Sequence, residues 1–227
     1  MEGDPTSFEE AMRSGHSSEW LDAMKDEMKS MSTNDVWDLE EIPNGTKTVG
    51  CKWVYKTKCD SKGNVERYKA RFVVKGFTQR EGIYYNETFS PISCKNSFRI
   101  IMALVAHFDL ELHQMDVKTA FLNGDLYENV YMAQPKGFVM EGKEHMGCRL
   151  KKSIYGLKQA SRQWYLKFDE TVRKFGFKEI RRTITFMQSS RMENLFSLTC
   201  MWMIFCFPAV ISICYWRQRN SCSQNLI

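Results

Sequence analysis

The chain has 227 residues, which fits one large domain or one domain and part of another. Hydrophobic residues make up 43% of the chain, enough for a real core. No basic flank precedes an apolar stretch at the N-terminus, which argues against a signal peptide and favours a cytoplasmic or nuclear location. The eight cysteines form no CxxC pair, which argues against a disulfide framework and against a zinc site.

The formal net charge of +5 hides a strong asymmetry along the chain. Residues 1–42 hold twelve acidic and three basic side chains, a balance of −9, whereas residues 52–80 hold nine basic and two acidic ones, a balance of +7. A concentrated basic segment is typical of a protein that binds a polyanion such as nucleic acid. The alternative is a solvated strand face without a partner. The nine basic residues are Lys52, Lys56, Lys58, Lys62, Arg67, Lys69, Arg71, Lys75 and Arg80.

Residues 1–44 are predicted to form a helical lead-in. Thr6 and Glu9 have capping-box spacing. One helical face carries a stripe that favours core packing over a ligand set, formed by Trp20, Leu21, Met24, Met28 and Met31. The segments TVGCKWVYKTK (48–58) and RYKARFVVKGF (67–77) are predicted strands of a basic hairpin.

The rest of the chain mixes helices and strands without regular alternation. SFRIIMALVAHF (97–108) and QASRQWYLKFDETVRKFGF (159–177) are predicted helices, and LELHQMD (110–116) is a predicted strand. This mixture indicates an α+β fold. Asp116 ends its strand, where a carboxylate suits an Mg²⁺ site or merely caps a turn.

Three long segments give a specific resemblance. They are KWVYKTKCDSKGNVERYKARFVVKGFTQREGIYYNETFSP (52–91), FDLELHQMDVKTAFLNGDLYENVYMAQPKGF (108–138) and LKKSIYGLKQASRQWY (150–165). Together they closely resemble the reverse transcriptase of copia-type long-terminal-repeat retrotransposons, from about Phe8 to Phe177. The resemblance implies a partial right-hand polymerase, with fingers and an incomplete palm over residues 45–179. It also implies an RNA or DNA template-primer, deoxynucleotide triphosphates and Mg²⁺ as partners.

The resemblance also implies roles for individual residues. Asp116 matches the first catalytic aspartate, which would bind two Mg²⁺ ions in nucleotidyl transfer. Lys69 and Arg71 would hold the incoming triphosphate, with Arg suited to bidentate phosphate contact. Phe121 would exclude a 2′-hydroxyl by steric contact, or else pack in the core.

Further positions would complete the nucleotide pocket and the nucleic-acid surface. Tyr155, Gly156 and Gln159 match the segment that lines the pocket, where Gly156 would permit close backbone approach. Lys75 would serve the triphosphate or the template. The remaining predicted nucleic-acid contacts are Lys52, Lys56 and Lys58.

The family's second metal-binding motif, YVDD, is absent from the chain, which contains no DD pair. The string TTG TAT GTG GAT GAT ATT TTG CTT encodes LYVDDILL, and moving the frame forward by one base gives CMWMIFCF, the sequence of residues 200–207. We therefore expect residues 180–227 to be an out-of-frame, disordered or non-native tail, and the chain to be an inactive polymerase fragment.

Two alternatives to a polymerase fragment remain. The first is a non-catalytic nucleic-acid-binding remnant that uses the basic hairpin. The second is a membrane-anchored protein, because residues 195–216 are 22 uncharged residues, long enough to span a bilayer and followed by arginines.

Overall fold

In the computed structural model the described residues are 3–91, 95–109, 111–174, 177–179, 186–189, 197–204 and 207–214. The chain divides into two compact units, which we describe separately. Unit 1 comprises Met1–Phe89 and Phe121–Lys167, and unit 2 comprises Ser90–Ala120 and Phe168–Ile227.

Unit 1 begins with two helices, α1 (Phe8–Arg13) and α2 (Ser17–Thr33). The capping interaction lies one residue later than predicted, because the Ser7 hydroxyl accepts from the Glu10 amide and the Glu10 carboxylate accepts from the Thr6 amide. Trp20, Met24 and Met31 of the predicted stripe are buried, which confirms core packing for them, whereas Leu21 and Met28 are half-buried.

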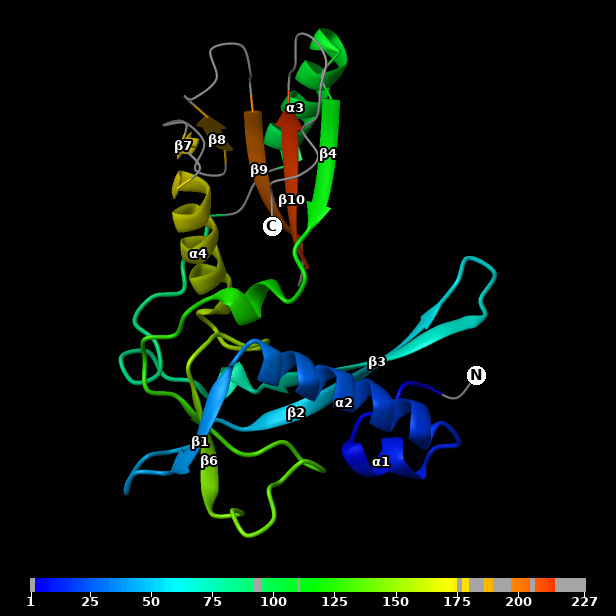
Figure 1. Ribbon diagram of the computed structural model, residues 1–227, viewed down its shortest axis with the longest axis vertical. Helices are drawn as coiled ribbons and strands as arrows, with labels where there is room; N and C mark the ends of the chain where they lie inside the picture. The colour runs from blue at the N-terminus through cyan, green and yellow to red at the C-terminus, as the bar shows by residue number, and fades with distance from the viewer. Residues whose placement is uncertain are drawn as a thin grey trace. The chain divides into compact units, whose positions relative to one another are not determined.

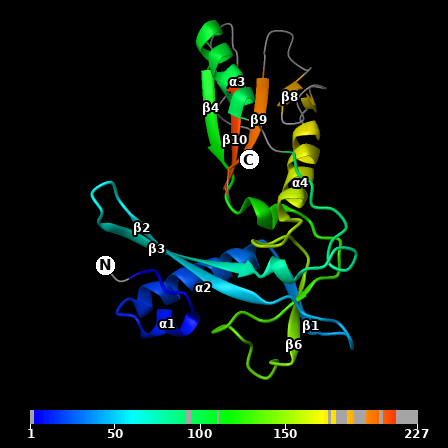
Figure 2. The same cartoon turned by 180° about the vertical axis from the view of Figure 1, so that it is seen from behind.

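The predicted basic hairpin is confirmed as β2 (Cys51–Cys59) and β3 (Val65–Val74), which pair antiparallel. One face of the hairpin carries buried aromatic side chains, and α2 runs along it (Figures 1 and 2). Trp20 of α2 makes an edge contact with Tyr55, whose hydroxyl donates to the Met24 sulfur. Trp53 packs against Phe72 across the two strands. The aromatic core therefore fixes which face of the hairpin is left to solvent.

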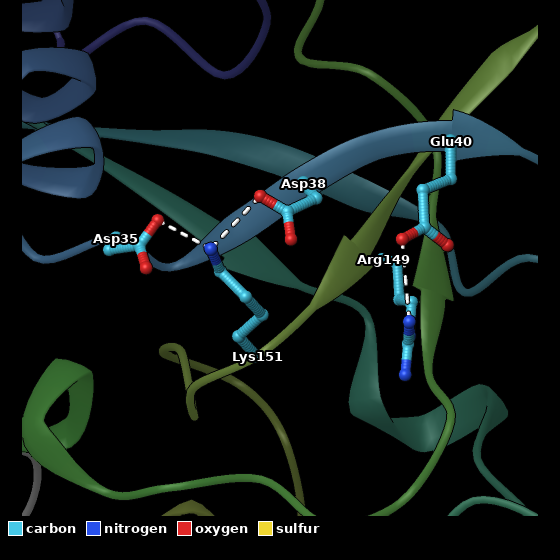
Figure 3. A network of polar contacts seen from close by, with 5 residues as sticks. All are labelled: Asp35, Asp38, Glu40, Arg149 and Lys151. Carbon is cyan, nitrogen blue, oxygen red and sulfur yellow. Dashed lines mark hydrogen bonds and ion pairs between the residues drawn. The ribbon is translucent and has the colours of Figure 1, made fainter.

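A second sheet in unit 1 has the order β1-β6-β5, formed by β1 (Trp37–Glu41), β6 (Met146–Leu150) and β5 (Tyr131–Met132). Polar contacts join β1 and its flanking turn to β6 and the residue that follows it (Figure 3). The Lys151 ammonium contacts Asp35 at 2.5 Å and Asp38 at 2.9 Å, and these hydrogen bonds raise the pKa of Lys151. Arg149 pairs with Glu40 at 3.3 Å.

Three further elements complete unit 1 and its boundary. They are the short 3₁₀ turns η1 (Gly76–Thr78) and η2 (Ala120–Asn123), and the helix α4 (Ala160–Lys174). Trp164 of α4 is buried.

Unit 2 contains α3 (Lys95–Phe108) and a sheet of order β4-β10-β9-β8-β7. Its strands are β4 (Glu111–Asp116), β7 (Phe177–Glu179), β8 (Phe186–Ser189), β9 (Ser197–Ile204) and β10 (Phe207–Cys214). In both views α3 covers one face of the β4–β10 part of this sheet (Figures 1 and 2).

The structure places β8, β9 and β10 in the region after residue 180, where we expected a disordered or non-native tail, and the out-of-frame origin of this region stays a prediction. Runs rich in Val, Ile, Phe and Trp have high strand propensity, whatever the origin of the codons that produced them. Within the described residues, no helix is long and apolar enough to cross a membrane. The chain is thus a mixed α and β protein with small antiparallel sheets, as predicted at the level of fold class.

Candidate nucleotide and nucleic-acid site

Three of the predicted site residues meet in unit 1. Tyr155 packs edge-on against Phe121, with ring centroids 5.6 Å apart and an interplanar angle of 76°. The Arg71 guanidinium lies over the Tyr155 ring, 5.4 Å from its centroid, in cation–π geometry. We call Arg71, Phe121 and Tyr155 the Arg–aromatic cluster. It brings together β3, η2 and the turn before α4, which are far apart in sequence.

Two glycines make this meeting feasible. Gly156 has φ +94°, and a Cβ there would lie 2.1 Å from the Val74 carbonyl oxygen. The Val74 amide donates to the Tyr155 carbonyl at 2.8 Å, so the turn is joined directly to the end of β3. A Cβ on Gly76 would lie 2.0 Å from the Gly156 oxygen. The close approach predicted for Gly156 is therefore to the protein's own backbone.

Gln159 does not join the cluster. It is fully buried, its side-chain amide donates to the Tyr84 carbonyl at 2.9 Å, and its oxygen accepts from Gln79 at 3.1 Å. Gln79, which our sequence interpretation missed, also accepts from the Lys158 amide at 2.8 Å. This buried amide pair fastens η1 to the start of α4. The signal available in the sequence was the polar Gln79 directly after the strand and turn, but its partner lies 80 residues away.

The outer face of the hairpin gathers most of the predicted nucleic-acid contacts. Directly opposite residues share one face of a sheet, and the register pairs Lys56 with Lys69, Lys58 with Arg67, and Val54 with Arg71. We call this the basic face, formed by Lys52, Lys56, Lys58, Arg67, Lys69 and Arg71. Like charges directly opposite each other destabilise a sheet, so these pairs lower the stability of the hairpin, and a bound polyanion would offset that cost.

Burial and the neighbouring Arg71 and Arg67 lower the pKa of Lys69, while Glu27 of α2 opposes that shift. The Glu27 carboxylate accepts from the Phe72 amide at 3.3 Å, and burial raises its own pKa against the effect of that hydrogen bond and of Arg71 and Lys69. Glu27 therefore offsets part of the positive charge next to the Arg–aromatic cluster.

Lys56 is exposed yet already paired. Its ammonium contacts Asp4 at 3.0 Å, and the same carboxylate accepts from the Thr57 amide at 2.7 Å. Burial favours the neutral form of Asp4, but these hydrogen bonds outweigh it and lower the pKa of Asp4. Lys52 and Lys75 are exposed, and the Lys75 stem runs past Gly50.

Asp116 belongs to unit 2, at the C-terminal end of β4, and its backbone pairs with Ala209 of β10. The strands β10 and β9 next to it contain no Asp or Glu. Among the described residues, no group of three or more His, Cys, Asp or Glu could hold a metal ion. An Mg²⁺ site takes several oxygen ligands, and neither β9 nor β10 supplies a side-chain carboxylate for one.

Comparison with known proteins identifies the family. The family model described as reverse transcriptase (RNA-dependent DNA polymerase) matches residues 34–196. The chain belongs to this reverse transcriptase family. The match ends at residue 196, which is after Glu179, where we expected the similarity to stop. It ends before Cys200, where the out-of-frame coding match begins.

Individual relatives agree with the copia-type prediction. The chain is 51% identical over 166 residues to the retrovirus-related Pol polyprotein from transposon TNT 1-94 of Nicotiana tabacum, covering 73% of the chain and 12% of that protein. It is 43% identical to the Pol polyprotein from transposon RE2 and 42% identical to that from transposon RE1, both of Arabidopsis thaliana, each covering 70% of the chain and 11% of the relative.

The chain thus corresponds to the reverse transcriptase part of a retrotransposon Pol polyprotein and spans about a tenth of the relatives' length. No solved structure matches it.

Proposed function

We propose that residues 45–179 form the fingers and part of the palm of a right-hand reverse transcriptase, with residues 1–44 as a helical lead-in. In this reading they bind the template-primer and an incoming deoxynucleotide. The observation that carries the proposal is the Arg–aromatic cluster beside the basic face. Such a surface offers cations for phosphates and aromatic rings for a sugar or base.

Each residue then has a separable task. Arg71, held over Tyr155, presents a planar fork to the triphosphate, and Lys69 adds a point charge beside it. Phe121, fixed by its edge contact with Tyr155, would limit the space next to the sugar and so favour deoxynucleotides. Gly156 and Gln159 would not contact the nucleotide themselves, but would position Tyr155 and the start of α4.

We also propose that this chain does not complete nucleotidyl transfer. Mg²⁺, when bound in the family, stabilises the developing charge on the reacting phosphate, and this is the main catalytic term. Asp116 has no carboxylate on the neighbouring strands to share that task with. The out-of-frame origin of Cys200–Phe207 accounts for the missing ligands.

The direct test is primer extension by the purified chain on an RNA template with Mg²⁺ and deoxynucleotides. We expect no extension, with or without Asp116→Ala. Extension that Asp116→Ala abolishes would refute the proposed inactivity and establish catalysis. Sequencing the gene and its transcript across codons 170–227 tests the origin of the tail: another frame that restores an uninterrupted YVDD supports the frame slip, and its absence in every frame overturns it.

A second candidate is a non-catalytic nucleic-acid-binding remnant, favoured by the like-charge pairs of the basic face. It predicts salt-sensitive binding of RNA or DNA that is weakened by neutralising Lys69, Arg71 and Lys75 to Gln. The matched control neutralises Lys25, Lys29 and Lys143, which are exposed and lie outside the basic face. Equal loss in both triple variants would mean that net charge alone, and not this face, governs binding.

A location in the cytoplasm or nucleus completes the proposal. It would be tested by fractionating cells that express the chain, and recovery with membranes that is lost on deleting 195–216 would refute it.

A further inference from the structure

Phe77 is the unusual residue next to the basic face. It lies in η1, directly after β3, and 81% of its surface is exposed. An aromatic ring left almost wholly in water gains none of the stabilisation that burying its apolar surface would bring. Neither the Arg–aromatic cluster nor the hairpin core uses it.

The backbone under Phe77 is fixed. Gly76 is buried against the Gly156 carbonyl, the Thr78 amide and hydroxyl both donate to the Lys75 carbonyl, and the Gln79 amide donates to Gly76 at 3.0 Å. Gln79 is only 3% exposed and is held by its hydrogen bonds to the start of α4. The exposed ring therefore projects from a rigid support, which reduces the entropy lost when a ligand packs against it.

The segment that carries the ring is basic. Residues 67–80 contain five Lys or Arg and no Asp or Glu. The cations of β3 lead along one strand face towards Phe77, and the exposed Lys75 and Arg80 lie on either side of it in sequence. A protein partner with a mixed surface or an uncharged apolar one does not match this pattern, whereas a flexible polyanion with flat apolar rings does.

We propose that Phe77 is a stacking platform for an unpaired base of single-stranded nucleic acid whose phosphates follow the cations of β3. The proposal rests on the proposed nucleic-acid binding and adds the form of nucleic acid that is recognised. Stacking on an aromatic side chain needs an exposed base face, which a continuous duplex does not offer, so the site selects single strands or single-stranded overhangs.

The test uses the full chain and fluorescence anisotropy with three labelled probes of one sequence: a single-stranded RNA, the equivalent DNA, and a blunt DNA duplex. We expect Phe77→Ala to weaken binding of single strands by about tenfold or more and to leave duplex binding and the salt dependence unchanged. Phe77→Trp should retain single-strand affinity. The control is Tyr127→Ala, whose ring is 82% exposed in the loop between η2 and β5, and it should bind all probes like the unmodified chain.

The outcomes separate this inference from the proposed function. Salt-sensitive binding that is identical in Phe77→Ala and the unmodified chain overturns the platform and leaves the basic face standing. An equal loss on duplex and single strands also overturns it, because the contribution would then not involve a base face. Absence of any salt-sensitive binding by the unmodified chain overturns both proposals. A loss confined to RNA or to DNA supports the platform and identifies the strand that it takes.

Discussion

Gly156→Ala tests how the Arg–aromatic cluster is held together. The substitution adds one methyl group at a residue whose φ is +94°, and that methyl would lie 2.1 Å from the Val74 oxygen and 2.7 Å from a Val73 side-chain carbon. Neither the turn nor β3 accommodates it without moving, because the Val74 amide is bonded to the Tyr155 carbonyl at 2.8 Å. The change therefore strains the turn and separates it from β3.

The expected magnitude has two parts. A left-handed backbone conformation costs an alanine about 1–2 kcal/mol relative to glycine, and forcing an extra methyl group into a packed site costs roughly 1–3 kcal/mol. Together these give about 3 kcal/mol, a large fraction of the 5–15 kcal/mol that is typical of a folded domain. With a urea slope of about 2 kcal/mol per molar, the unfolding midpoint should fall by about 1.5 M.

The assay is urea unfolding followed by tryptophan fluorescence, because Trp20, Trp53 and Trp164 are all buried in unit 1. The matched control is Gly45→Ala, where φ is +82° but nothing lies within 4 Å of the added Cβ. It carries the backbone cost alone, so its midpoint should fall by roughly half as much or less. Equal midpoints for the two variants would refute the close approach of the turn to β3.

Three further predictions follow from other contacts. Gln79→Ala should lower the free energy of unfolding by roughly 2 kcal/mol, since the Lys158 amide and the Gln159 side chain lose a buried partner, and urea unfolding would measure it. Burial raises the pKa of Glu27 above 4.5, so over this pH range the folded chain keeps a proton that the unfolded chain has lost. The contribution of Glu27 to the free energy of unfolding therefore falls as pH rises from about 4.5 through the raised pKa. Glu27→Gln should remove that slope, and an unchanged difference in unfolding free energy between the two proteins across this pH range would contradict it. Lys58→Gln should relieve the repulsion opposite Arg67, adding roughly a few tenths of a kcal/mol of stability while reducing the salt slope of nucleic-acid binding by about one unit. Loss of both stability and binding in this variant would mean that Lys58 has a structural role.

Local periodicity predicted the elements with strong patterns. The alternation in 48–58 and 67–77 gave the hairpin, and the spacing of Trp20, Met24 and Met31 gave α2, because one face of each element must be buried. The register places most of the cations of the two strands on one face, opposite the buried aromatic side chains. Such patterns act over neighbouring residues and need no tertiary information.

The parts of the site that escaped prediction depend on contacts between distant segments. The hydrogen bond between Gln159 and Gln79 spans 80 residues, and nothing in either local sequence indicates it, while the place of Gln159 at the nucleotide pocket stays a prediction. The contact of Lys56 with Asp4, 52 residues away, was likewise not predicted, and the contact of Lys56 with nucleic acid stays a prediction. The strands after residue 180 were missed because the expectation of a non-native tail took no account of their high strand propensity.

The basic face links the stability of the chain to its surroundings. Dissolved salt screens the repulsion between Lys56 and Lys69 and between Lys58 and Arg67, so added salt should make the unliganded fold harder to melt. The same salt competes with phosphates and weakens the complex. Nucleic acid and dissolved salt therefore stabilise the fold as alternatives to each other. The rise in melting temperature on adding RNA should be greatest in dilute buffer and should vanish as ionic strength rises. The folded state of a retroelement protein with such a face is least stable without nucleic acid in dilute buffer, and binding of the template stabilises it.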